Sequence, residues 1–303
     1  MPHILKQVNV HTLRGSSSGW LVLNDDGRSF IRKARSDFRK TPDLPRVYVL
    51  FGDRPYLAFD SSCSTCDEII YMGYGARQEI EAWAHSIRAA TSGSGGDDGV
   101  RPEPFLPLVG LLPPALYLMI MIEHEARGPD GKFFWDRIGT TYEDYLHTLR
   151  EKDFGPEFLY ATESKDRLNP EKVEEYKVAI GQGARPFGIG LHITAAATAL
   201  LDGHHKSTAY HQLGKKVPIL TIAEVNTLIG GVQPGEVTDW GFGFHNEVSL
   251  GDIPKEGTDF EIARNKAGRD SGFSLADGKR WNSQLGIDIA TVRIARQRMS
   301  RRR

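Results

Sequence analysis

The sequence is short of cysteine, of net charge and of long apolar runs. Its two cysteines, Cys63 and Cys66, cannot form a disulfide framework. The 38 basic and 39 acidic side chains leave a formal net charge of -1, so no overall field draws the chain to nucleic acid or to an anionic membrane. The first residues, MPHILKQVNV, lack the charged, apolar and small segments of a secretory signal. These features favour a cytoplasmic protein in a reducing compartment.

One uncharged run, FLPLVGLLPPALYLMIMI at residues 105–122, approaches the length of a membrane span. Its internal prolines would remove backbone donors that lipid cannot replace, and its flanks carry the acidic Glu103 and Glu123 where basic anchors are typical. We therefore expect no membrane partner. The run instead predicts an extended, proline-broken approach and then a short buried helix, ALYLMIMIEHEA, at residues 115–126.

The clearest domain boundary is SGSGGDDGVRPEP at residues 92–104, which has the composition of a flexible linker. The patterns before it predict an N-terminal β-rich α+β domain at residues 1–91, with strands at residues 21–24, 29–34 and 46–59 and a helix at residues 76–90. A second domain is expected at residues 105–230. Residues 231–303 are expected to be a loop-rich region with a basic tail. The predicted fold class is α+β.

Residues 169–222 contain a regular order of predicted elements. Asn169 can cap a helix that begins with Pro170, and a glycine at position 181 or 183 can end it. Two strands follow, FGIGLHI and TALLD. A helix at residues 204–213 and the strand VPILTI complete the pattern.

The sequence DGHHK, residues 202–206, lies where a predicted strand ends and a predicted helix begins. The first N–H groups of a helix lack intrahelical partners and its dipole favours negative charge, so this turn predicts an anion site. The cation of Lys206 and the imidazoles of His204 and His205 would suit a phosphate, and Ser207 adds a hydroxyl donor. As chemistry alone, the motif also fits a structural cap or a solvated turn.

The order of these elements resembles the ParB/sulfiredoxin-like superfamily. The resemblance rests on the helix from about residue 171, the G-Q-G-A-R-P turn, L-L-D-G-H-H-K, a helix ending in L-G, and K-K-V-P-I-L-T-I. It covers about a sixth of the chain. It implies a small mixed-sheet domain that binds nucleotides or phosphorylated substrates, fused here to a separate N-terminal domain.

The turn itself distinguishes the branches of this superfamily. Sulfiredoxins resemble G-G-C-H-R at this point, and His204 stands where they have a reactive cysteine, which argues against sulfinic acid repair. Partitioning ParB proteins use G-E-R-R and a following helix-turn-helix, which is not evident after Val225. The D-G-H-H-K form is most similar to the D-G-H-x-R form of the free serine kinase branch. Lys206 replaces the arginine of that form and offers a point charge instead of a planar fork.

The resemblance to the kinase branch implies a nucleotide-dependent phosphotransferase-like enzyme. Its expected cofactors are ATP or another nucleotide together with Mg²⁺, and its expected acceptor is a small molecule or a protein. The implied catalytic residues are Glu163, as the base for an acceptor hydroxyl, with Asp202 and His204. The implied nucleotide-binding residues are Arg167, Gly203, His204, His205, Lys206 and Ser207. No metal site built by the protein alone is predicted, because Cys63 and Cys66 lack a second pair of zinc ligands.

An alternative from another class is a DNA-associated ParB-like binding protein or nuclease, in which the same turn holds backbone phosphate. The tail RIARQRMSRRR fits this alternative, although such tails are commonly solvated. Its arginines are Arg293, Arg296, Arg298, Arg301, Arg302 and Arg303. Nucleotide-dependent protection against melting favours the phosphotransferase, whereas salt-sensitive retention on duplex DNA favours the alternative.

Overall fold

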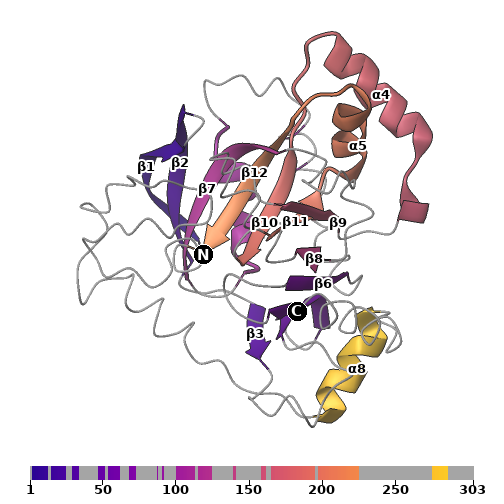
Figure 1. The fold of residues 1–303 in the computed structure, drawn as a ribbon. Helices are drawn as coiled ribbons and strands as arrows, with labels where there is room; N and C mark the ends of the chain where they lie inside the picture. The colour runs from indigo at the N-terminus through magenta and orange to yellow at the C-terminus, as the bar shows by residue number, and fades with distance from the viewer. Residues whose placement is uncertain are drawn as a thin grey trace.

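The computed structural model of this chain describes residues 2–12, 15–24, 29–33, 47–51, 54–61, 68–72, 87, 91, 100–112, 115–124, 139–140, 158–161, 165–194, 197–224 and 275–285. The strands among these residues pair into one sheet of seven strands and one of five, with helices beside them (Figure 1). The α+β class expected from the sequence is therefore confirmed at this coarse level.

The larger sheet is mixed and has the order β1-β2-β7-β12-β10-β11-β9. The pairs β10–β12 and β11–β9 are parallel, and the other neighbours are antiparallel. The strands are β1 (His3–Thr12), β2 (Gly15–Asn24), β7 (Ala115–His124), β9 (Phe158–Ala161), β10 (Gly188–Thr194), β11 (Ala197–Asp202) and β12 (Val217–Glu224). The strands predicted from FGIGLHI, TALLD and VPILTI are β10, β11 and β12, so this part of the prediction is confirmed.

The smaller sheet is antiparallel throughout, in the order β3-β4-β5-β6-β8. Its strands are β3 (Ser29–Lys33), β4 (Val47–Phe51), β5 (Arg54–Ser61), β6 (Glu68–Met72) and β8 (Gly139–Thr140). The strand predicted at residues 29–34 is therefore confirmed. The run predicted as a single strand at residues 46–59 instead forms the antiparallel pair β4 and β5. Of the helix predicted at residues 76–90, only Ile87 lies among the described residues, and it is helical.

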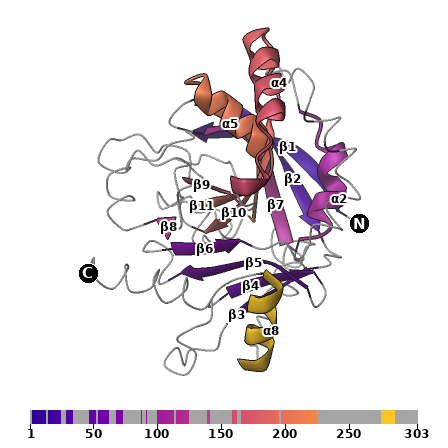
Figure 2. The ribbon, with the colours of Figure 1, turned by 90° about the vertical axis from the view of Figure 1, so that its right-hand side faces the viewer.

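Helix α8 (Leu275–Leu285) lies against β5 and buries Trp281 and Asn282 (Figure 2). This helix lies within residues 231–303, which were expected to be loop-rich and of which the structure describes only residues 275–285. Its sequence, LADGKRWNSQL, contains the poor helix formers Gly278 and Asn282, so local propensity hides it. Packing against the smaller sheet decides its structure instead.

Strand pairing crosses the domain boundary expected at residues 92–104. β2 comes from the predicted N-terminal domain and pairs with β7, whereas β8 comes from the predicted second domain and pairs with β6. Each sheet therefore contains segments from both sides of the expected linker. Residues 92–99 of that linker lie outside the described residues, but its end includes the buried Pro102 and the 3-10 helix η1 (Glu103–Phe105). Linker composition is a local signal and carries no information about pairing between distant strands.

The apolar run at residues 105–122 is buried where it is described from Leu116 to Ile120, but its structure differs from the expected one. The expected extended approach contains η1 and helix α2 (Leu106–Val109), and the expected buried helix is strand β7. β7 lies between β2 and β12. A strand buried on both faces lacks polar alternation, so periodicity cannot distinguish it from a buried helix. Among the described helices, none has the length and apolarity needed to cross a bilayer.

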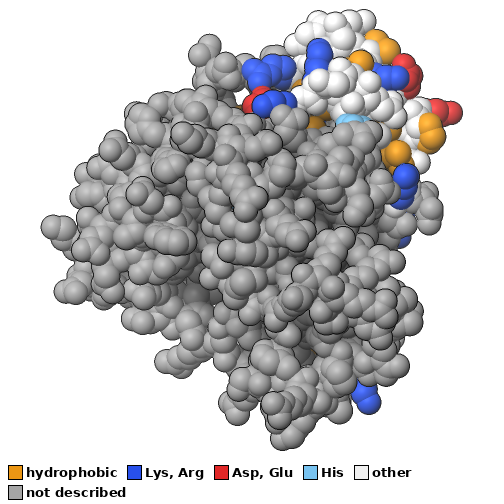
Figure 3. Space-filling model, viewed as in Figure 1, with side chains coloured by type: hydrophobic (Ala, Val, Ile, Leu, Met, Phe, Trp, Pro, Cys, Tyr) orange, Lys and Arg blue, Asp and Glu red, His pale blue; other side chains and the backbone are white. Residues whose placement is uncertain are grey.

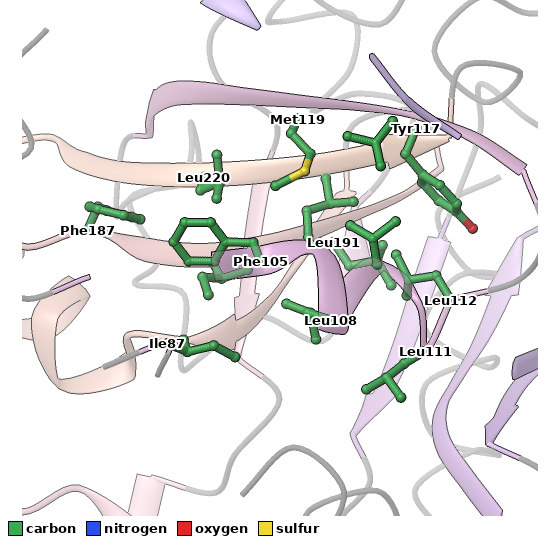
Figure 4. Close-up of a cluster of buried hydrophobic side chains, with 14 residues drawn as sticks. Ile87, Phe105, Leu108, Leu111, Leu112, Tyr117, Met119, Phe187, Leu191 and Leu220 are labelled. Carbon is green, nitrogen blue, oxygen red and sulfur yellow. The ribbon is translucent and has the colours of Figure 1, made fainter. Parts of the chain in front are cut away.

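An apolar core lies between the larger sheet and the segment that contains η1 and α2 (Figure 4). Phe105 and Leu108 from this segment belong to one buried cluster with Met119 of β7, Leu191 of β10 and Leu220 of β12. The sheet strands that lead to the α5 turn are therefore fixed by burial on this face.

The end of β2 is also joined to α2 by hydrogen bonds. The side-chain amide nitrogen of Asn24 donates to the carbonyl oxygens of Val109 and Leu112, each at 2.9 Å. Asn24 is fully buried, so these two bonds satisfy donors that water cannot reach. The N-terminal hairpin is thus connected to the core by polar as well as apolar contacts.

Helices α4 (Pro170–Gly181) and α5 (His204–Gln212) match the predicted helices and approach each other at one end (Figure 2). The predicted cap is confirmed, because Asn169 Oδ1 accepts from the N–H groups of Glu171 and Lys172 at 2.9 and 3.4 Å. The two helices share a second apolar cluster with strands β9, β11 and β12, whose members include Val173, Ile180, Leu200, Ala209, Tyr210 and Ile219.

Candidate functional site

The chain turns from β11 into α5 at Gly203, whose φ of 103° and ψ of 18° lie in the left-handed region. A Cβ at this position would lie 2.7 Å from the Cα of Gly188, so the turn needs glycine for its conformation and for space. The Gly203 carbonyl accepts from the N–H of Ser207 at 2.7 Å. Gly203 has no side chain with which to cap the helix, and an external anion could accept from the N–H groups of the first turn.

His204, the first residue of α5, is buried inside the protein. Its side chain is 3% exposed, and desolvation by burial lowers its pKa to about 3, although the Asp202 carboxylate acts in the opposite direction. The imidazole is therefore neutral at physiological pH. It cannot provide the positive charge that the sequence pattern suggested for phosphate binding.

His205 connects the beginnings of α5 and α4. Its Nε2 atom accepts from the backbone N–H of Asn169 at 3.0 Å. Because an N–H group can only donate, Nε2 carries no proton, so the neutral imidazole has its proton on Nδ1. Desolvation by burial and the nearby charge of Lys172 lower the pKa of His205 and support this neutral form. His205 can offer a hydrogen-bond donor to a ligand, but not a cation.

Lys206 is buried, with 3% exposure, and its ammonium group is saturated by protein acceptors. Its Nζ atom donates to Thr91 Oγ1 at 2.7 Å, to the Phe187 carbonyl at 3.0 Å and to Asp202 Oδ2 at 3.0 Å. It also lies 5.9 Å from the centre of the Tyr176 ring. An ammonium has three donors, and all three are used here. The expectation that Lys206 holds an anion directly is therefore inconsistent with this geometry.

The neighbouring polar residues have different environments. The Asp202 side chain is 37% exposed, so its carboxylate is reachable even though one oxygen bonds Lys206. Thr208 Oγ1 donates to the His204 carbonyl at 2.8 Å, which is an internal bond of α5. The buried hydroxyl of Ser207 has no hydrogen-bond partner among the described residues. Asp202 and His205 are thus the partly exposed side chains of the turn, whereas His204, Lys206 and Ser207 are buried.

Of the remaining predicted residues, the structure describes only Arg167. Glu163 lies outside the described residues, although β9 ends at Ala161 beside Leu200 of β11. Arg167 is exposed in the 3-10 helix η3 (Lys165–Arg167), which precedes α4. Cys63, Cys66 and the arginine tail at residues 293–303 also lie outside the described residues.

Lys172 is a further basic residue near the turn that the DGHHK motif does not indicate. Lys172 and Tyr176 are four residues apart on α4 and therefore share a helix face, and the Tyr176 ring faces Lys206 of α5. The effect of Lys172 on the pKa of His205 agrees with this placement. Lys172 is exposed, and no described residue forms an ion pair with its ammonium. The signal was present as a lysine in the first turn of a capped helix, but its relation to DGHHK depends on tertiary structure.

The surface around α4 and α5 carries several Lys and Arg side chains mixed with acidic ones (Figure 3). One acidic partner is Glu123, whose carboxylate bonds Arg185 at 2.7 Å. Within the ranges that the structure describes, His, Cys, Asp and Glu side chains form no group of three or more able to hold a metal ion.

Comparisons of the chain with protein families, with curated proteins and with solved structures gave no match. The geometry of the turn is therefore the basis for a proposed function.

Proposed function

We propose that the protein binds a phosphate group of a nucleotide at the start of α5 and is a phosphotransferase-like enzyme. The observation that carries the proposal is the meeting of two helix beginnings, α4 and α5, at the 3.0 Å bond between Asn169 and His205. Both helix dipoles then present their positive ends to the same place. Asn169 satisfies N–H groups of α4, whereas α5 begins at a glycine that offers no cap. The first turn of α5 is therefore better suited to bind an anion than the first turn of α4.

The expected contacts differ from those suggested by the motif alone. Backbone N–H groups of the first turn and Nδ1–H of His205 would donate to the phosphate oxygens. Lys172 would supply the positive charge, because Lys206 is committed to internal acceptors. Gly203 would provide the left-handed turn that leads into these N–H groups.

Phosphoryl transfer requires mainly positioning and charge neutralisation from the protein. The partly exposed carboxylate of Asp202 fits two roles: a base for an acceptor hydroxyl, or one ligand of Mg²⁺. A bound Mg²⁺ would neutralise charge on the transferred phosphate, and such ions commonly take one or two carboxylates with substrate phosphates. Glu163 remains a proposed second carboxylate for the base role.

The direct test is nucleotide binding by the full chain. Thermal melting and calorimetry with ATP, ADP, CTP and GTP, each with and without Mg²⁺, should show protection by at least one nucleotide. A radiolabelled γ-phosphate would then report transfer to candidate acceptors. Absence of binding to every nucleotide, with salt-sensitive retention on duplex DNA, would support the DNA-associated alternative.

Two lysines of α4 provide a matched comparison for the location of the site. Lys172→Ala should weaken nucleotide affinity by about tenfold, since one charge-assisted contact contributes about 1.5 kcal/mol or more. Lys177→Ala should have no effect, because Lys177 already pairs with Glu174 at 2.7 Å. Equal affinities for the two variants would place the nucleotide elsewhere.

A further inference from the structure

The acceptors that surround Lys206 come from three separate parts of the chain. Thr91 precedes the expected linker, Phe187 leads into β10 and Asp202 ends β11. The Lys206–Thr91 bond spans 115 residues of sequence and is the shortest of the three, at 2.7 Å. A single ammonium therefore joins the turn of the proposed site to the N-terminal part of the chain.

Thr91 is held at this point by a second bond. Its carbonyl oxygen accepts from the Phe187 N–H at 3.2 Å, and its side chain is fully buried. Phe187 in turn offers its own carbonyl to Lys206 at 3.0 Å. Thr91, Phe187 and Lys206 thus form a closed set of hydrogen bonds beside Gly188, the residue against which Gly203 packs.

The alternative role, direct contact of Lys206 with a ligand, conflicts with this arrangement. To reach an anion, the ammonium would have to break its bonds to the buried Phe187 carbonyl and to the buried Thr91 hydroxyl. Unsatisfied buried polar groups are strongly disfavoured, so the lysine is held in place by several partners at once.

We propose that Lys206 is a positioning residue of the phosphate site, and that its bond to Thr91 makes the N-terminal segment part of that site. The proposal rests on the proposed function at α5. Lys206 fixes the Asp202 carboxylate and the backbone of the Gly203 turn without touching the ligand. The Thr91 hydroxyl then controls ligand affinity from a position that the ligand does not reach.

The first experiment examines the ammonium group directly in the ligand-free full chain. In protein labelled with ¹⁵N at lysine side chains, the buried Lys206 ammonium should give a slowly exchanging NMR signal that Lys206→Met removes. Thr91→Val deletes one acceptor and should shift or broaden this signal. Thr91→Ser keeps the hydroxyl and should leave it close to its original position, and Lys177→Met is a control that should leave it unchanged.

The second experiment measures affinity for ATP with Mg²⁺ and for inorganic phosphate. Thr91→Val and Lys206→Met should each weaken binding by about tenfold or more. Because both act through one bond, the double variant should bind no more weakly than Lys206→Met alone. Thr91→Ser keeps the hydroxyl but loses the methyl group, and should bind with nearly the parent affinity. If packing of the methyl group were the cause, Thr91→Ser would bind weakly instead.

Several outcomes would overturn the proposal. They are additive effects in the double variant, parent-like binding by Thr91→Val, or a Lys206 signal that couples to the phosphorus of bound phosphate. A parent protein that binds neither probe would remove the proposed function instead. In that case a Lys206 signal unaffected by Thr91→Val would also remove the link to the N-terminal segment, whereas a shifted signal would retain it.

Discussion

The backbone N–H of Asn169 donates to Nε2 of His205 over 3.0 Å, and this bond joins the beginnings of α4 and α5. The same asparagine caps α4 through its side chain. A single residue therefore fixes the start of one helix and the imidazole orientation in the next. The neutral state of His205 follows from this contact, because a protonated Nε2 could not accept the bond.

His204 should make stability depend on pH. Its pKa is about 3 in the folded protein, against an ordinary value of 6.5, so between these values the unfolded chain binds one more proton. Stability should therefore be complete above pH 6.5 and fall as the pH decreases, by up to about 1.4 kcal/mol per pH unit. Denaturant unfolding of the parent and of His204→Gln should show a shallower pH dependence in the variant. His3→Gln, at an exposed position of β1, is the control; an equal slope in all three proteins would contradict a buried neutral His204.

Substitution of two left-handed glycines should have unequal effects. Gly203→Ala combines a φ of 103° with a Cβ only 2.7 Å from Gly188 Cα, whereas Gly214→Ala has a φ of 65° and open space. Backbone strain should cost about 1 kcal/mol or more at both positions, and overpacking should add about 1 to 3 kcal/mol at Gly203 alone. Chemical denaturation can compare them, and similar losses would mean that the Gly203 turn shifts to relieve the contact with Gly188.

The cap of α4 should be separable from the bond to His205. Asn169→Ala removes the side-chain acceptor but keeps the backbone N–H, and should lower the free energy of unfolding by about 1 kcal/mol. Asn169→Asp retains an acceptor and should be close to the parent in stability. A loss as large in Asn169→Asp as in Asn169→Ala would show that the amide has another role.

Asn24 should report whether the N-terminal hairpin folds with the rest of the larger sheet. Asn24→Leu removes the donor of the Leu112 carbonyl, whereas the Val109 carbonyl keeps its bond from the Leu112 N–H at 2.9 Å. The lost partner of a buried carbonyl should cost about 1 to 3 kcal/mol. The variant should still unfold in one transition if the sheet is one cooperative unit. Gln7→Ala, at an exposed side chain of β1, should be nearly neutral. A separate early transition in Asn24→Leu would instead support an independently folded N-terminal domain.

Local patterns predicted the elements next to the site because particular residues mark where each element begins or ends. Asn169 with Pro170 marks the beginning of α4, and Gly203 marks the change from β11 to α5. The chemistry of the turn was harder to predict, since DGHHK places three basic side chains side by side without indicating which are buried. His204 and Lys206 are buried and His205 is partly buried. Their burial depends on how α5 packs against the larger sheet and α4, and the motif carries no information about that packing.

Long-range strand pairing explains where the structure differs from the local patterns at β7 and at residues 92–104. β7 was predicted as a helix because its partners β2 and β12 cover both of its edges and its faces are apolar. The boundary at residues 92–104 was placed by composition, whereas the sheets connect residues on either side of it. Information about such pairing is distributed over the whole chain.

The strand order of the larger sheet also constrains how the protein is made. The hairpin of β1 and β2 is synthesised before β7, with which the other edge of β2 pairs, and β7 in turn pairs with the later strand β12. On the ribosome, apolar strand edges must therefore remain unpaired until residues up to 224 have emerged. Proteins dominated by such distant pairings fold slowly and expose aggregation-prone edges. The nascent chain should accordingly depend on chaperone protection more than a protein whose neighbouring strands are consecutive.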